Sequence, residues 1–101
     1  MIIRIFRATI HEGKEAEFRE FFLHTALPLV KSQPGLVSAT PGLPRPESPR
    51  EFCMVMVWKD VESLKAFAGE DWQNPHIHPD EAELVADRAL HHYDLAQLIT
   101  A

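Results

Sequence analysis

The sequence predicts one α+β domain in which strand, helix, strand, strand, helix and strand follow one another, a ferredoxin-like βαββαβ topology with helices on one face of a four-stranded antiparallel sheet. One supporting observation is that the spacing of apolar residues alternates between the period of strands and the period of helices. Another is that 101 residues, 46% hydrophobic and 25% charged, have the size and composition of a globular domain. We therefore treat residues 1–101 as a single domain.

The first half of the chain contains a strand, a helix and a second strand. Residues 2–10 are rich in Ile, Phe and Thr and precede a glycine turn, which is typical of a strand. Apolar residues then recur with helical spacing, but Pro28 lies within this pattern and has no backbone donor. We expect the helix to kink or restart near residues 26–27. A proline and a glycine in residues 32–35 end it, and residues 36–40 form a short strand.

The second half contains two strands and a second helix. A proline-dense loop precedes residues 52–58, which are apolar at every position, as is typical of a strand covered on both faces. A helix capped by an aspartate follows over residues 60–69. We expect a short helix that begins at Pro79 and a last strand over residues 89–99.

The predicted sheet is apolar on both faces, although the two helices cover only one of them. The residues that imply a second cover are Ile3, Ile5, Phe52, Met54, Met56 and Trp58. A domain of this size has a large surface relative to its volume and cannot bury a second apolar face by itself. We therefore expect a homodimer in which the sheets of two copies face each other.

Charge and cysteine content exclude several classes of partner. A net charge of −5, with Lys and Arg scattered along the chain, disfavours nucleic acid and anionic membrane surfaces. No stretch approaches the roughly 20 apolar residues needed to cross a bilayer, and the first residues do not resemble a signal peptide. The single cysteine, Cys53, excludes an internal disulfide. Together these features predict a cytoplasmic protein.

Three segments are similar, in their order and spacing, to one known family. They are residues 10–18 (IHEGKEAEF), 33–37 (QPGLV) and 58–67 (WKDVESLKAF). On these segments the chain resembles the antibiotic biosynthesis monooxygenase superfamily of dimeric α+β barrels, which includes cofactor-free quinol and polyketide monooxygenases and haem-degrading relatives. The resemblance implies this fold and a dimer, whereas the reaction must be argued from the site.

The residues that the haem-degrading relatives use are only partly matched in this sequence. They use an Asn on the first strand with a Trp and a His after the second helix. Here Arg7 is the candidate on the first strand, and Trp72 is followed by His76 and His78 at a closer spacing. This departure disfavours haem degradation.

Histidines are the candidate catalytic residues. Histidine exchanges protons near neutral pH, which suits the deprotonation of a phenol or hydroquinone before it meets oxygen. His76, His78 and His92 are therefore the candidate bases. The alternatives are that His76 and His78 cap a helix or meet solvent, and that the inward-pointing member of the pair His91-His92 is a core residue. His76 and His78 also have the spacing of two metal ligands, but no third ligand is fixed, so we expect no metal.

Aromatic residues and one arginine are the candidate substrate-binding residues. Trp58 and Trp72 would form flat walls for an aromatic substrate, and Phe22 would extend them. Core packing is the alternative, above all for Trp58. Arg4 and Arg7 face opposite sides of their strand, and we prefer Arg7 as the partner of an anionic substrate. Its alternative partner is a glutamate.

The leading hypothesis from the resemblance and these residues is a cofactor-independent monooxygenase. It would act on a phenolic, quinol or polyketide-like aromatic compound with molecular oxygen, and it would need neither a metal nor an organic cofactor. A protein that binds haem or a hydrophobic metabolite without catalysis is the second hypothesis. An isomerase or cyclase is the third.

Overall fold

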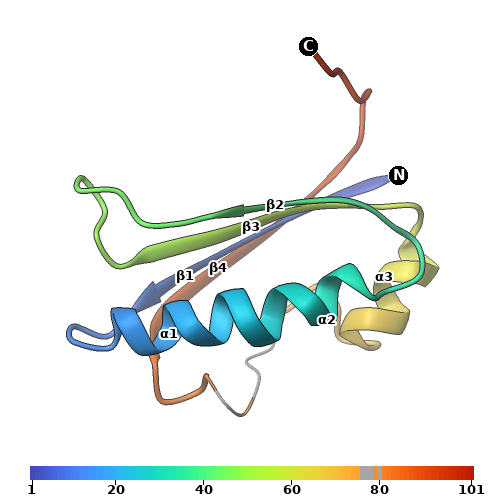
Figure 1. Ribbon diagram of the computed structural model, residues 1–101. Helices are drawn as coiled ribbons and strands as arrows, with labels where there is room; N and C mark the ends of the chain where they lie inside the picture. Colours follow the sequence, from blue (N-terminus) through green and yellow to red (C-terminus); the bar gives the residue numbers. More distant parts are fainter. Residues whose placement is uncertain (76–78, 80) are drawn as a thin grey trace.

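Four strands form one antiparallel sheet, and the helices lie together on one of its faces (Figure 1). This architecture comes from a computed structural model that describes residues 1–75, 79 and 81–101. The elements in chain order are β1 (Ile2–Ile10), α1 (Glu15–Phe21), the π-helical turn η1 (Phe22–Ala26), α2 (Leu27–Lys31), β2 (Leu36–Gly42), β3 (Glu51–Trp58), α3 (Val61–Ala68) and β4 (Val85–Asp94). The strand order is β2-β3-β1-β4. The predicted α+β ferredoxin-like fold is therefore confirmed.

The side chains of the central strands β1 and β3 alternate between the two faces of the sheet. The register places Ala8 opposite Phe52, and both are buried under the helices. The other buried residues of this face are Ile2, Arg4, Ile10, Met54, Met56 and Trp58. Ile3 and Ile5 lie on the opposite face. The expectation that Phe52, Met54, Met56 and Trp58 need a second cover is therefore wrong, because the helices already cover them.

Aromatic side chains join the first helix to the sheet. The ring of Phe52 on β3 lies 4.8 Å from the ring of Phe18 on α1 and 5.4 Å from that of Phe22, both between centroids. On the same face Trp58 stacks on Phe67 of α3 at 5.1 Å. These contacts fix both helices over one layer of the core.

None of the described helices is long and apolar enough to cross a membrane.

The first helix continues through Pro28, but it widens just before the proline. Between α1 and α2, the turn η1 has π-helical geometry, and the N–H of Leu27 donates to the carbonyl of Phe22, five residues earlier. Pro28 has no N–H for the regular ladder, and a π turn is one way in which a helix accommodates such a disruption. The structure therefore shows a change of helical pitch where the sequence predicts a kink or restart.

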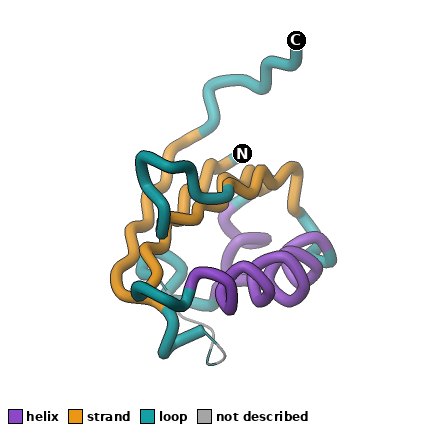
Figure 2. Tube along the Cα trace, turned by 60° about the vertical axis from the view of Figure 1, so that its left-hand side comes forward, coloured by secondary structure: helices purple, strands orange, loops and turns teal. Residues whose placement is uncertain are grey.

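The last strand begins and ends earlier than residues 89–99, because its pairing with β1 sets its limits. In that pairing Val85 lies opposite Ile10 and Asp94 opposite Ile2. The chain beyond Asp94 leaves the sheet and runs away from the body of the molecule (Figure 2).

Two other boundaries differ from the prediction. Residues 81–84 form a turn, in which the N–H of Leu84 donates to the carbonyl of Glu81 over 2.9 Å, where we expected a helix from Pro79. The second strand continues through Pro41 to Gly42. A proline is acceptable there because β2 is an edge strand.

Candidate functional site

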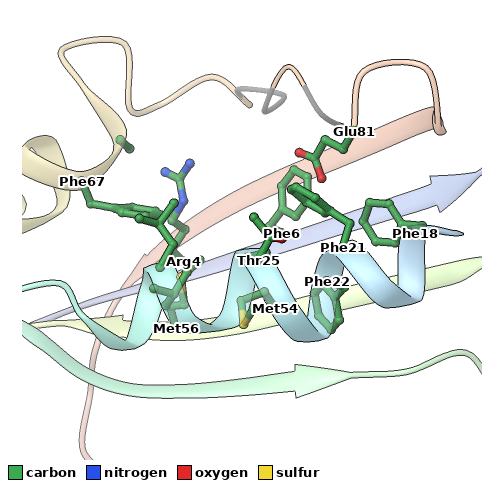
Figure 3. A pocket seen from close by; sticks show the side chains of 14 residues that line it. Arg4, Phe6, Phe18, Phe21, Phe22, Thr25, Met54, Met56, Phe67 and Glu81 are labelled. Carbon is green, nitrogen blue, oxygen red and sulfur yellow. The ribbon is translucent and has the colours of Figure 1, made fainter.

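A cavity of about 280 Å³ lies between the sheet and the first helix (Figure 3). Its lining side chains come from β1, the first helix, β3, the end of α3 and the turn before β4. They are Arg4, Phe6, Phe18, Phe21, Phe22, Thr25, Ala26, Leu29, Val30, Met54, Met56, Phe67, Ala68 and Glu81. The volume is near the lower end of the range of about 300–1,000 Å³ that is usual for ligand pockets. A mainly apolar wall with two charged side chains is suited to a small aromatic ligand.

The sequence produces this space by placing small side chains beside aromatic ones. Thr25 and Ala26 of η1 line the cavity one turn after Phe21 and Phe22. Ala68 ends α3 next to Phe67. Larger residues at these positions would fill the space between the helices and the sheet.

Arg4 supplies the positive charge of the cavity. It lies in the middle of β1, with 5% of its surface exposed. Its Nη1 donates to the backbone carbonyl of Trp72 over 2.6 Å and contacts Nε2 of His92 at 3.0 Å. Burial lowers the pKa of Arg4 from its ordinary value to about 10, so the side chain remains protonated at neutral pH. None of the described carboxylates forms an ion pair with it.

His92 is held by two neighbours beside Arg4. It lies directly opposite Arg4 in the β1–β4 pairing, and its ring meets the Trp72 ring edge to face with 4.9 Å between centroids. Because a guanidinium can only donate, Nε2 of His92 accepts, and the ring proton is on Nδ1. Partial burial, followed by the charge of Arg4 and the nearby His91, lowers the pKa of His92 below 6.5. The imidazole is therefore neutral at pH 7.

Glu81 is the acidic residue that lines the cavity. It is 7% exposed and lies in the turn that leads into β4. Figure 3 shows its carboxyl beyond the rings of Phe6 and Phe21, to the side of Arg4. The cavity thus has a cation and a carboxylate at separate places along an aromatic wall.

The structure brings some of the predicted site residues together. Phe22 lines the cavity, and His92 and Trp72 meet at its Arg4 end. Trp58 is completely buried against Phe67 and is not among the lining residues. Its Nε1 is enclosed without a hydrogen-bond partner among the described residues. This position matches core packing, the alternative that we gave for Trp58.

Arg7 is a further predicted residue that does not line the described cavity. Arg7 lies on the opposite face of the sheet, where its Nη1 is 3.6 Å from a carboxylate oxygen of Glu51. The structure therefore shows the alternative that we gave for Arg7, an ion pair with a glutamate. His76 and His78 lie outside the residues that the structure describes. Within the described part of the chain, no group of three His, Cys, Asp or Glu side chains could hold a metal ion.

Arg4 is the site residue that the sequence interpretation passed over. Ile3 and Ile5 flank it, so both faces of β1 read as apolar and alternation cannot say which arginine is buried. The missing information is the pairing of Arg4 with His92 and Met56 on neighbouring strands. That pairing fixes the face, and it exists only in the folded sheet.

The sheet and its one-sided helices define a fold that solved structures share. A protein of Shewanella oneidensis is 20% identical, with a TM-score of 0.75, over 91% of this chain and 87% of that one. SnoaB, a cofactor-independent oxygenase from Streptomyces nogalater, is 22% identical, with a TM-score of 0.70, over 99% and 97%. A MhuD variant with two manganese protoporphyrin IX molecules bound per active site is 18% identical, with a TM-score of 0.71, over both whole chains. At these identities the likeness shows the fold.

The family follows from a second comparison. The family model described as antibiotic biosynthesis monooxygenase matches residues 1–74. This chain therefore belongs to the antibiotic biosynthesis monooxygenase family. No curated protein is a significant match to it.

Proposed function

We propose that this protein is a cofactor-independent monooxygenase that acts on a phenolic, quinol or polyketide-like aromatic compound. The observation that carries the proposal is an aromatic-walled cavity with a buried, protonated Arg4. A cation in apolar surroundings stabilises a phenolate more strongly than it would in water, because the effective dielectric constant is lower. Family membership and the cofactor-independent oxygenase SnoaB of similar fold support the same reaction class.

The proposed reaction needs only the substrate and molecular oxygen. Loss of the phenolic proton gives an electron-rich anion that can donate electrons to oxygen. For a naphthol, C10H8O and O2 give the quinone C10H6O2 and H2O. One oxygen atom forms the new carbonyl, the other leaves as water, and the substrate supplies all four electrons. The cavity contributes by excluding water and by holding the anion at Arg4.

The candidate proton acceptor among the described residues is His92, whose Nε2 contacts Arg4. His92 is neutral, but its Nε2 is occupied by Arg4, so it orients the arginine in the ligand-free protein. We keep His92 as a base that becomes available if a bound anion replaces it at Arg4. His76 and His78 remain predicted bases.

Oxygen uptake tests the proposal directly. Purified protein would be supplied with a panel of naphthols and hydroquinones, with the protein-free rate subtracted. We expect uptake of one O2 per quinone formed, with one atom of ¹⁸O₂ in the product. The cavity-filling Ala26→Phe should abolish uptake, whereas Ala16→Phe, on the exposed surface of α1, should not. Absence of uptake across the panel, or equal uptake by Ala26→Phe, would contradict the proposal.

We also propose a homodimer formed by the sheet face that the helices leave uncovered. Ile3, Ile5 and Val55 lie on this face and are partly exposed, and Tyr93 beside Ile3 is 55% exposed. A second copy would bury this apolar surface.

Sedimentation equilibrium of the purified protein tests the dimer. We expect a dimer that Val55→Glu converts to a monomer. The control is Val61→Glu, which places the same charge at the exposed start of α3. A monomer at every concentration would contradict the dimer.

We also propose a cytoplasmic location, which the single free cysteine supports.

The second candidate is a protein that binds haem or a hydrophobic metabolite without catalysis. The observation that favours it is the shared fold with MhuD, which holds manganese porphyrins. Titration with haemin separates the two candidates. A stoichiometric Soret shift, without oxygen uptake from any phenol, would replace the monooxygenase by the binding function.

A further inference from the structure

The hydrogen bonds of Arg4 leave part of its guanidinium available. Nη1 is used by the Trp72 carbonyl and by His92 Nε2, two neutral acceptors. A guanidinium has five N–H groups, and those on Nε and Nη2 meet no acceptor among the described residues. Among the described residues, the fully buried side-chain nitrogen or oxygen without a hydrogen-bond partner is Trp58 Nε1. Nε and Nη2 of Arg4 are therefore not sealed off from the cavity. With respect to the described residues, Arg4 therefore has free donors beside the cavity that it lines.

The charge balance at this end of the cavity is incomplete. A buried cation is unfavourable unless an anion or several hydrogen bonds compensate for its lost hydration. Arg4 is 5% exposed and has no described carboxylate partner. Glu81 lines the same cavity, to the side of Arg4. A ligand with one negative group would complete the balance at Arg4 and would keep its uncharged end towards Glu81.

The volume limits the ligand. An apolar cavity of roughly 150 Å³ holds one benzene molecule. A cavity of about 280 Å³ therefore accommodates about two rings. Aromatic side chains at several points of the wall favour a flat ligand.

We propose that the cavity selects a one- or two-ring aromatic monoanion, a carboxylate or an acidic phenol, and that Arg4 determines this selectivity by binding the anionic oxygen. This inference rests on the proposed function and narrows its substrate class by charge and size. A carboxylate fits the free edge of a guanidinium through two parallel hydrogen bonds. A hydroxynaphthoate would combine this anchor with a phenolic ring that can be oxidised.

The test compares two probes of the same shape and different charge. The affinities of 2-naphthoate and 2-naphthamide would be measured by isothermal titration calorimetry. We expect the carboxylate to bind about 10- to 100-fold more tightly, as expected for hydrogen bonds between charged groups. Arg4→Gln should remove this preference, Arg4→Lys should retain part of it, and Arg19→Gln, on the exposed side of α1, should leave it unchanged. Circular dichroism would check the fold of each variant.

The outcomes separate this inference from the proposed function. Equal affinities for the two probes in the unmodified protein, or binding of neither, would overturn the inference even if Arg4→Gln did not fold. A carboxylate preference that survives in folded Arg4→Gln would also overturn it. A preference without oxygen uptake from 1-hydroxy-2-naphthoate or any other phenol would support the selectivity and contradict the monooxygenase. Oxygen uptake from neutral phenols at equal rates in the unmodified protein and in Arg4→Gln would support the monooxygenase and contradict the selectivity.

Discussion

The two faces of the sheet carry the same types of residue in different surroundings. Arg4 and Arg7 lie on one strand, yet Arg4 is buried against neutral acceptors, while Arg7 is half-exposed beside Glu51. His92 and His91 are neighbours, yet His92 contacts Arg4 and Trp72, while His91 is exposed. The difference teaches that the side of the strand, more than the residue type, determines the chemistry. Paired substitutions across the sheet can test this.

The largest expected difference concerns packing. Phe52→Ala removes a buried ring that contacts Phe18 and Phe22, so the free energy of unfolding should fall by about 3–5 kcal/mol. Cys53→Ala, at the next residue on the other face, should lower it by less than about 1 kcal/mol. Urea denaturation followed by circular dichroism measures both. Similar losses for the two variants would show that the faces are equally important for stability.

The two arginines should differ next. Arg4→Ala deprives the Trp72 carbonyl and His92 of their donor, so we expect a loss of about 1–3 kcal/mol in the free energy of unfolding and stronger quenching of Trp72 fluorescence by acrylamide. Arg7→Ala should change the free energy by about 0.5 kcal/mol or less. The same urea series would decide this, and an equal loss for Arg7→Ala would refute the distinction.

The two histidines should differ in their pH dependence. The pKa of His92 in the folded protein is below its ordinary value of 6.5, so the unfolded chain takes up this proton first as the pH falls. Stability is therefore lost as the pH falls through 6.5, and the loss levels off below the folded pKa. Melting temperatures between neutral and mildly acidic pH should fall less for His92→Asn than for the unmodified protein. His91→Asn is the control, and an identical slope for His92→Asn would contradict the prediction.

The smallest expected effect is the coupling between Arg7 and Glu51. Their ion pair is 3.6 Å long, and the two side chains are 51% and 37% exposed. A double-mutant cycle with alanine should give a coupling energy of about 0.2–1 kcal/mol that decreases in high salt. A larger, salt-insensitive value would contradict this prediction, because it would mean that the ion pair is shielded from solvent.

Much of the fold could be predicted from local patterns. The change from two-residue to helical spacing after residue 10, and the aspartate cap of α3, are properties of short segments. The cap is confirmed by the N–H of Ser63, which donates to Asp60 Oδ1 over 2.8 Å. The limits of β4 could not be predicted, because they follow from pairing with β1.

The candidate site could be predicted only in part. Phe22, Trp72 and His92 can be singled out from their residue types, but the contact between Trp72 and His92 cannot, because it depends on the fold. The choice between Arg4 and Arg7 could not be predicted, because apolar neighbours on both sides of β1 remove the alternation that would distinguish its faces. The strand pairing that decides it joins residues far apart in the sequence.

The wide turn η1 also sets the rotational phase of the helix that follows it. In an uninterrupted α-helix, Leu29 would lie about 20° from the direction of Phe18 and Val30 about 120° away. The structure shows the opposite preference, since Val30 is 5% exposed and Leu29 is 46% exposed. The extra residue in the turn has moved the buried stripe forward by one position. If one residue of η1 were deleted and the turn became α-helical, the present Val30 would stand eleven positions after Phe18, about 20° from its direction, and would stay buried. The extra residue therefore lengthens this helix without changing which side chains of its last turn face the core.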